Sequence, residues 1–278
     1  METLINGFKT NRSFAITSIL VLVLLAIALA APLLAPYDPT RAVMRDAFME
    51  PTGAHIFGTD KLGRDCFSRV LFGARASLTG VLILVASVFT VGTSMGVLSG
   101  YFGGKVDMVI MRISDMMISF PGMILAIAVA GIMGGSLVNA VIALTIVSWT
   151  KYARLARSMV LKVKRRDYVE AAIVNGGTPP HILWVHILPN ILPMMVITAA
   201  ADIGALMMEL AGLSFLGFGS QPPAPEWGLM LNEGRQQLQT APWLMFFPGL
   251  AIFVTVVIFN LWGDNLRDVL DPRNDVKD

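Results

Sequence analysis

Long apolar runs separated by short polar segments dominate the chain. The runs cover about residues 14–35, 76–100, 108–133, 136–149, 185–212 and 244–262. A helix needs about 20 apolar residues to cross a bilayer core of about 30 Å, because lipid cannot satisfy a bare backbone. The fourth run is shorter, but Lys151, Arg154 and Arg157 follow it at helical spacing, so we expect its helix to continue past the membrane. The pattern predicts an all-α integral membrane protein with six transmembrane helices.

Composition agrees with this class and excludes several others. Hydrophobic residues make up 55% of the chain and charged residues 14%, whereas ordinary soluble domains have about 25% charged residues. The net charge of +2 gives no strong field for binding nucleic acid. One Cys and three His exclude a disulfide framework and leave few ligands for a metal centre. The 17 Met fall mostly in apolar runs, where Met is common filler, so we expect this chain to bind neither a metal nor a cofactor.

The distribution of Lys and Arg predicts the orientation. With a cytoplasmic N-terminus, fourteen of these residues lie in cytoplasmic segments and seven in external ones. The first run also follows two cations, as in a signal peptide, and Ala28-Leu29-Ala30 resembles a cleavage site. It exceeds the roughly 7 to 15 apolar residues of a signal peptide, which favours a retained anchor.

These observations predict one membrane domain with both termini in the cytoplasm. Its expected parts are a cytoplasmic N-terminus at 1–13, a first helix at 14–35, an external loop at 36–75, a core at 76–266 that contains the cytoplasmic loop 151–184, and a cytoplasmic tail at 267–278.

The loop 151–184 contains a short helix with signals at both ends. Asp167 can cap it while Glu170 reaches back from the third position. Gly176 provides a left-handed stop, and Thr178 with Pro179 can begin the next helix. These signals predict a helix of about two turns. The helix either docks into a soluble partner or lies on the membrane surface. Its expected exposed apolar residues are Tyr168, Val169, Ala172 and Ile173.

Several motifs resemble the permeases of ABC importers. Glu170-Ala171-Ala172, with Gly176 six residues after the Glu and Leu188-Pro189 later, resembles the EAA loop of that family, although His186 stands where the pattern often has Ile. Other motifs resemble the dipeptide, oligopeptide and nickel branch, and the second of its two paired permeases. These are Phe57-Gly58-Thr59-Asp60, Gly63-Arg64-Asp65, Ser68-Arg69, His186-Ile187-Leu188-Pro189-Asn190, Ser214-Phe215-Leu216-Gly217, Gln221-Pro222-Pro223-Ala224-Pro225-Glu226-Trp227-Gly228 and Leu266-Arg267-Asp268-Val269-Leu270-Asp271-Pro272.

The resemblance implies a non-catalytic subunit of a type I importer in the cytoplasmic membrane. Its partners would be a second homologous permease, two ATP-binding subunits that hold ATP and Mg, and an extracytoplasmic solute-binding protein. The short helix would be the cytoplasmic coupling helix that contacts the ATPase. The coupling residues would be Asp167, Tyr168, Val169, Glu170, Ala171, Ala172 and Gly176. The resemblance does not decide whether the solute is a dipeptide, an oligopeptide, nickel or a metal chelate. The last third of the sequence is somewhat more similar to the nickel members.

Four ionisable residues within the apolar runs are candidates for the translocation pathway. Arg112 and Asp115 are three residues apart and can pair on one helix face. Asp202 and Glu209 are seven apart, so they share a face of the fifth helix. Charged groups inside a membrane avoid lipid, so we expect the two carboxylates to face a wet path or, alternatively, a subunit interface.

Two rival functions follow from other features. Asp115, Asp202 and Glu209 suit a secondary transporter driven by protons or sodium, but no repeated topology accompanies them. Gly92-Thr93-Ser94-Met95-Gly96 matches the text of a serine-hydrolase motif, but it lies in an apolar helix without a nearby His. Gly92, Gly96, Gly100 and Gly104 recur every fourth residue, which favours close helix packing instead.

Two external segments have open roles. Around Gly58 to Arg69, four charged residues can form a salt-bridged elbow that is either structural or a docking surface. At about 228–239 we expect an interfacial helix, with Leu229, Met230 and Leu238 on the membrane and Asn232, Glu233, Arg235 and Gln236 in water.

Overall fold

The computed structural model describes residues 11–270, so most of the predicted segments 1–13 and 267–278 lies outside the described residues. Every regular element in the described range is helical. The elements are α2 (Arg12–Leu34), η1 (Met44–Asp46), α3 (Cys66–Phe102), α4 (Gly104–Ile118), α5 (Gly122–Met133), α6 (Leu137–Lys164), α7 (Asp167–Val174), α8 (Pro179–Ile182), η2 (Leu183–Ile187), α9 (Leu188–Phe215), α10 (Trp227–Gly234), η3 (Arg235–Gln237) and α11 (Trp243–Leu270).

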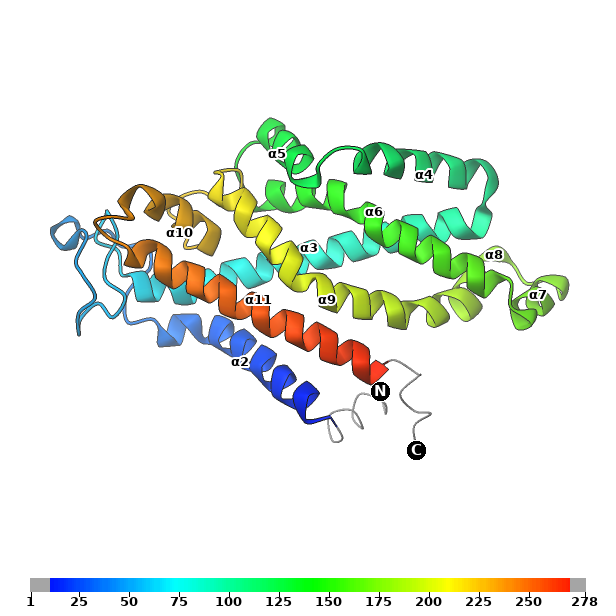
Figure 1. Cartoon of the computed structure of the whole chain (residues 1–278), viewed down its shortest axis with the longest axis horizontal. Helices are drawn as coiled ribbons and strands as arrows, with labels where there is room; N and C mark the ends of the chain where they lie inside the picture. The colour runs from blue at the N-terminus through cyan, green and yellow to red at the C-terminus, as the bar shows by residue number, and fades with distance from the viewer. Residues whose placement is uncertain (1–10, 271–278) are drawn as a thin grey trace.

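The long helices run side by side along the longest axis of the molecule (Figure 1). The segment before α3 and the short helix α10 gather at one end, which we call the loop end, whereas α7 and α8 occupy the other, the α7 end. Val21 and Ala28 of α2 are buried in the main core with residues of α3, α6 and α9. The first apolar run is therefore an integral part of the fold.

Four described helical segments are long and apolar enough to cross a membrane: Arg12–Leu34, Cys66–Phe102, Pro179–Phe215 and Trp243–Leu270. The bent pair α4 and α5 is a fifth candidate. Helix α6 is continuous from Leu137 to Lys164, as its basic spacing predicts, and its second half holds the charges that lower its hydropathy. The all-helical prediction is confirmed, and four to five of the six predicted spans meet these criteria.

The third apolar run does not form one helix. It is interrupted between Ile118 and Gly122, and the two pieces meet at 95°, so the expectation of a single helix at 108–133 is corrected. Pro121 has no N–H to donate to the preceding turn and disfavours helical geometry at Phe120. Helix α5 consequently turns away from α4 (Figure 1).

Close packing of α3 against α6 forms the centre of the bundle. A Cβ at Gly92 would lie 2.5 Å from Tyr152 Cβ, one at Gly96 would lie 2.3 Å from the Ala153 carbonyl oxygen, and one at Gly100 would lie 2.8 Å from Val160 Cβ. The predicted small-residue face is therefore confirmed for three of its four glycines. Gly104 departs, because it lies beyond the end of α3 and a Cβ there would meet nothing within 4 Å.

We predict that Gly96→Ala lowers the stability of the purified protein by about 1 to 3 kcal/mol, because the added methyl would force apart two helix backbones. Differential scanning calorimetry in detergent measures this as a lower unfolding temperature. Gly249→Ala is the matched control, since the nearest atom to a Cβ at that helical position is 3.8 Å away. Equal unfolding temperatures for the two variants would contradict the packing argument.

Candidate functional site

The short helix α7 begins one residue earlier than its capping signals predict. Asp167 is its first residue, Arg166 occupies the cap position, and no side-chain hydrogen bond caps the helix. The predicted capping box is therefore wrong. Asp167 and Glu170 instead lie in the first turn, where carboxylates interact favourably with the positive end of the helix dipole.

The end of α7 follows the sequence prediction. Gly176 has a φ of 81°. Its N–H donates to the carbonyl of Ile173 at 3.0 Å, and the N–H of Gly177 donates to that of Ala172 at 3.0 Å. This pair of bonds is the Schellman arrangement, which needs a residue that tolerates the left-handed region. Gly176 is therefore a sharp stop for α7.

One side chain fastens α7 to the bundle. Val169 is fully buried and packs in a cluster formed by residues of α3, α6 and the α8–α9 segment, so the prediction that it is exposed is wrong. The cluster contains Val97, Tyr101, Val160, Val169, Ile182, Ile187 and Ile191. The opposite side of α7 stays open, because Tyr168 and Ile173 are exposed and Val174 is 85% exposed. Ala172 is half-buried and Ala171 is exposed.

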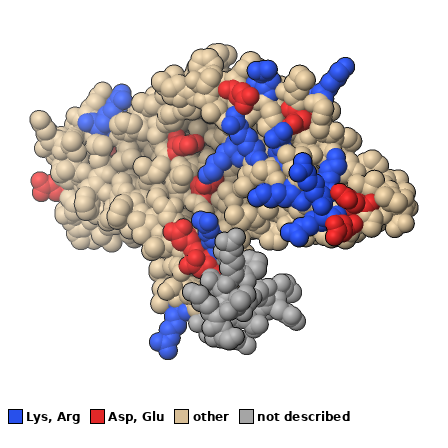
Figure 2. Space-filling view, turned by 45° about the vertical axis from the view of Figure 1, so that its right-hand side comes forward, with Lys and Arg blue, Asp and Glu red and all other residues tan. Residues whose placement is uncertain are grey.

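Cations surround α7 on the adjoining part of α6. Figure 2 shows Lys and Arg side chains gathered on the face that leads toward the α7 end. Lys162, Arg165 and Arg166 are exposed there, and Lys164 Nζ donates to the Tyr101 carbonyl at 2.7 Å. The exposed apolar face of α7 therefore adjoins a basic surface.

The two carboxylates predicted to share a face of the fifth helix both face α6. Lys151 Nζ donates to both carboxylate oxygens of Asp202, each at 2.7 Å, and the Tyr152 hydroxyl donates to Asp202 at 3.1 Å. Ser148 Oγ lies 3.5 Å from Glu209 Oε2. Sequence reasoning missed these α6 partners, although the spacing of Ser148 and Lys151 by three residues is a signal for a shared face.

The predicted pair of Arg112 and Asp115 does not form. Asp115 pairs with Arg154 of α6 at 2.6 Å, and Arg154 Nε also donates to Ser114 Oγ at 3.1 Å. Arg112 is exposed and makes no ion pair with another described residue. Local spacing proposed a partner on the same helix, whereas tertiary packing provides a better one on the neighbouring helix.

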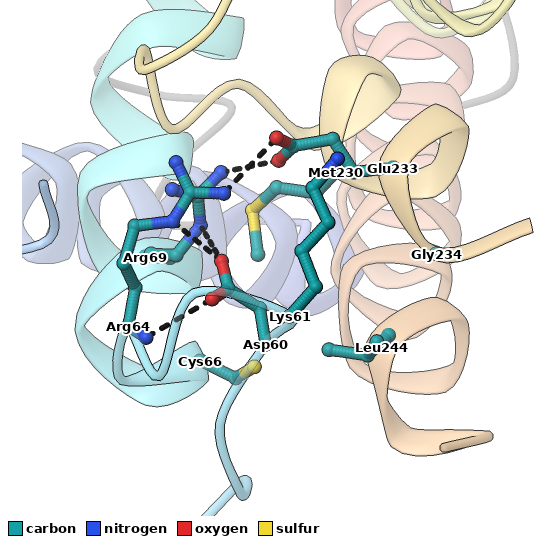
Figure 3. Close-up of a pocket in the computed structure, with 9 residues that line it drawn as sticks. All are labelled: Asp60, Lys61, Arg64, Cys66, Arg69, Met230, Glu233, Gly234 and Leu244. Atoms are coloured by element: carbon teal, nitrogen blue, oxygen red, sulfur yellow. Dashed lines mark hydrogen bonds and ion pairs between the residues drawn. The ribbon is translucent and has the colours of Figure 1, made fainter. Parts of the chain in front are cut away.

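At the loop end, a buried ion cluster joins the segment before α3 to α10. Arg64 and Arg69 are each 1% exposed. Arg64 pairs with Asp60 at 2.6 Å and with Glu233 at 3.0 Å, and Arg69 pairs with Glu233 at 2.7 Å. All four side chains converge between the cyan start of α3 and the gold α10 (Figure 3). The predicted elbow is confirmed, but Glu233 belongs to it and is not in water.

The two carboxylates of this cluster favour the charged state of Arg64. Burial opposes the charge of Arg64, but the two carboxylates outweigh that effect, so the pKa of its guanidinium is raised above the ordinary value. Asp65 completes the elbow by accepting hydrogen bonds from the backbone and hydroxyl of Ser68, each at 2.7 Å, and by contacting His55 Nδ1 at 2.9 Å.

A second buried carboxylate anchors the start of α10. Glu226 accepts from the N–H groups of Gly228 and Leu229, each at 2.9 Å, and from Ser77 Oγ of α3 at 3.2 Å. Burial raises the pKa of Glu226, against the effect of these hydrogen bonds. Leu229 and Met230 are buried in protein, so the expectation that they rest on the membrane is corrected. Helix α10 is held on α3 at both of its ends.

Comparison with known proteins identifies the family. Residues 92–276 match the binding-protein-dependent transport system inner membrane component, and residues 5–51 match the N-terminal transmembrane domain of oligopeptide transport permease C. The chain belongs to this family of transport permeases. The resemblance to the permease subunits of ABC importers is thereby confirmed.

Individual relatives cover nearly the whole permease. The glutathione transport system permease GsiD of Pectobacterium atrosepticum is 47% identical over 91% of this chain and 84% of its own length. The probable D,D-dipeptide permease DdpC of Escherichia coli is 41% identical over 98% and 93% of the two chains. The nickel permease NikC of Escherichia coli is 39% identical over 96% and 97%.

Solved structures share the fold of the permease. A chain of the inward-facing methionine transporter MetNI superposes with a TM-score of 0.60 at 21% identity, covering 73% of this chain and 97% of that one. A chain of an amino acid ABC transporter crystallised with histidines gives a TM-score of 0.53 at 16% identity, over 74% and 94%.

The hydrolase alternative is not favoured by the geometry of the permease. Ser94 lies within the continuous helix α3, whereas a nucleophile elbow requires a sharp strand-to-helix turn. Gly92 and Gly96, which complete the motif, are the residues that contact α6. Helix packing therefore accounts for this motif.

We predict that Glu233→Gln destabilises the purified permease by about 3 kcal/mol, because it leaves one buried Arg charge without a counter-charge. The unfolding temperature in detergent measures the loss. Glu50→Gln is the control, since Glu50 is exposed in the same loop region and such a change has an effect of about 0.5 kcal/mol or less. A cluster of no structural importance would give both variants the wild-type unfolding temperature.

Proposed function

We propose that this permease crosses the cytoplasmic membrane six times and forms, with a second homologous permease, the path by which an ABC importer takes up short peptides or related small solutes. In this topology α4 and α5 together make the third crossing and α6 makes the fourth. The N-terminus, the C-terminus and α7 lie in the cytoplasm, and the loop end lies outside. The start of α2 and the end of α11 pack together through Phe14 and Leu266, which supports placing both termini on one side.

The observation that carries the proposal is the two-sided character of α7. One face is fixed to three helices through Val169, and the other presents Tyr168, Ile173 and Val174 to the exterior. A helix this short is unstable alone in water. Its exposed apolar face is therefore suited to contact with a partner. The partner we propose is one of two ATP-binding subunits, which hold ATP and Mg and hydrolyse the nucleotide, while this chain is non-catalytic.

The substrate class is proposed from the relatives. Their names include dipeptide, glutathione and nickel transport, and glutathione is itself a small peptide. We propose a short peptide or a peptide-like chelate as the solute, delivered by an extracytoplasmic binding protein to the loop end. The buried ion cluster would keep that surface rigid during delivery.

A secondary transporter that uses Asp115, Asp202 and Glu209 is the alternative. The three carboxylates have partners on α6 that are available to either function. The alternative requires uptake by the permease alone, in vesicles with a proton or sodium gradient and no ATPase. Such uptake would refute the importer proposal, whereas uptake that requires ATP and the partner subunits would support it.

We predict that Val174→Asp weakens binding of the ATP-binding subunit by about tenfold, because it places a charge in the apolar contact. The dissociation constant in detergent measures the effect. Val174 is 85% exposed, so the variant should keep the wild-type unfolding temperature. Val174→Leu is the conservative control and should bind normally. Normal binding by Val174→Asp would contradict the proposed contact.

We also predict that Gly176→Val uncouples ATP hydrolysis from uptake, whereas Gly176→Asn retains most coupling. A Cβ at Gly176 would meet nothing within 4 Å, so the two variants differ in how well they tolerate a φ of 81°. Asn adopts this conformation far more readily than Val. The ratio of solute transported to ATP hydrolysed measures coupling. Equal ratios for the two variants would show that the backbone turn is not required.

Glu170→Ala should also weaken coupling, by removing a carboxylate from the first turn of α7.

A further inference from the structure

A set of polar groups lies halfway along the bundle, between α6 and α9. It contains the ammonium group of Lys151, the carboxylates of Asp202 and Glu209, and the hydroxyls of Ser148 and Tyr152. The side chain of Lys151 is 62% exposed and that of Asp202 is 17% exposed. We call these five residues the mid-helix polar site.

The site lies far from both ends of its helices. Asp202 is midway between Leu188 and Phe215, about 20 Å from either end of α9 at 1.5 Å per residue. Lys151 is also about 20 Å from the start of α6. In the proposed topology both charges lie about 20 Å inward from the external ends of α6 and α9, which is within a hydrocarbon core of about 30 Å. Lys151 is then inside the membrane, so the start of the cytoplasmic loop expected at residue 151 moves further along α6. An exposed ammonium group at that depth must face water or protein, because contact with lipid is costly.

The mid-helix polar site is more exposed than the buried ion cluster at the loop end, which has a structural role. There, Arg64 and Arg69 are 1% exposed and each is surrounded by protein. In the mid-helix polar site the cation is largely open and only one side of it is paired. The charges also do not balance, because Glu209 contacts Ser148 and forms no ion pair with another described residue. The site therefore contains one largely exposed cation and two partly buried carboxylates.

We propose that the mid-helix polar site is a charged subsite of the translocation path that receives the two ends of a zwitterionic short peptide. Glu209 binds the α-ammonium group, and Lys151 binds the terminal carboxylate. Asp202, with the Tyr152 hydroxyl, holds Lys151 in place when no solute is present. The proposal rests on the proposed function and adds the substrate chemistry and residues of the path.

The spacing fits peptides of two or three residues. Seven residues of helix separate Glu209 from Asp202, a rise of about 10 Å. An extended chain spans about 3.3 to 3.6 Å per residue, so a dipeptide is about 7 Å long and a tripeptide about 10 Å. The side chains of Lys151 and Glu209 can reach the ends of either one. Both a dipeptide and glutathione have an ammonium group and a carboxylate for these two positions.

The first test is accessibility in the complete importer, which contains both permeases, the ATP-binding subunits and the binding protein. Lys151→Cys is introduced after Cys66→Ser, since Cys66 is the single cysteine of the chain and is buried. A membrane-impermeant cationic methanethiosulfonate should label Cys at 151. The control is Leu22→Cys, because Leu22 is also exposed but lies within the apolar run of α2 and should stay unlabelled. Absence of labelling at 151, or equal labelling of both variants, would overturn the proposal.

The second test is transport by the same importer in proteoliposomes, with Ala-Ala and glutathione as probes. Glu209→Gln and Lys151→Met should each lower the number of peptides moved per ATP hydrolysed by about tenfold, the effect of about 1.4 kcal/mol. Lys151→Arg should retain most of the ratio. The matched control is Lys105→Met, which removes an exposed Lys of α4 outside the site and should keep the wild-type ratio.

The outcomes distinguish this subsite from the proposed function. If wild-type importer moves either peptide with ATP and the variants at Glu209 and Lys151 do so with the wild-type ratio, the subsite is refuted and the importer stands. If those variants instead lose assembly and ATP hydrolysis together, the residues are structural and the subsite is again refuted. If wild type moves neither peptide, the proposed substrate class is wrong. If it moves them without ATP, the importer proposal itself fails.

Discussion

The backbone contact between α3 and α6 is the constraint on which the rest of the structure depends. Gly92, Gly96 and Gly100 have no side chains along one stripe of α3, so that stripe lies directly against Tyr152, Ala153, Ala156 and Val160 of α6. In a membrane, burial of apolar surface gives no advantage over contact with lipid, so close contact between small residues is a main source of helix association. This contact fixes the position and rotation of α6, which carries the polar groups of the path at its middle and α7 at its end.

Ion networks lie at several levels of this bundle, and their exposure differs with position. At the loop end, the charges of Arg64, Arg69, Asp60 and Glu233 balance and are buried, as rigid structure requires. Midway, Lys151 and Asp202 are unequally exposed and leave Glu209 without a cation. Toward the α7 end, Arg157 pairs with Asp107, which also accepts a hydrogen bond from Ser99. Of these three networks, the middle one alone combines a largely exposed cation with a carboxylate that has no cationic partner, and function is proposed for it.

The sequence predicts the helices well because their signals are local. Apolar run lengths, the glycine repeat and the stop at Gly176 depend on the chain within a few residues. The break at Pro121 is also local, but its 95° angle depends on where α5 packs. The prediction that Asp167 caps α7 is wrong, because the cap position is occupied by Arg166. Residue type alone favours Asp over Arg at a cap position.

Partners of charged residues were harder to predict, because they come from elements far apart in the chain. Asp115 has Arg112 at helical spacing, yet it pairs with Arg154, which is brought to it by the packing of α6. Glu233 was expected in water because its helix is amphipathic, but Arg64 and Arg69 are 164 or more positions away in sequence. Periodicity assigns a residue to a face of its helix, and only the fold decides what covers that face.

The same fold links α7 to the middle of the path. Val169 packs with Val160 of α6 and Ile191 of α9. Val160 is nine residues from Lys151, about 14 Å along α6, and Ile191 is eleven residues from Asp202, about 16 Å along α9. Both connecting segments are helical throughout, so a displacement of α7 that tilts one helix against the other must change the distance between Lys151 and Asp202. A partner that moves α7 can therefore open or close this ion pair without touching it.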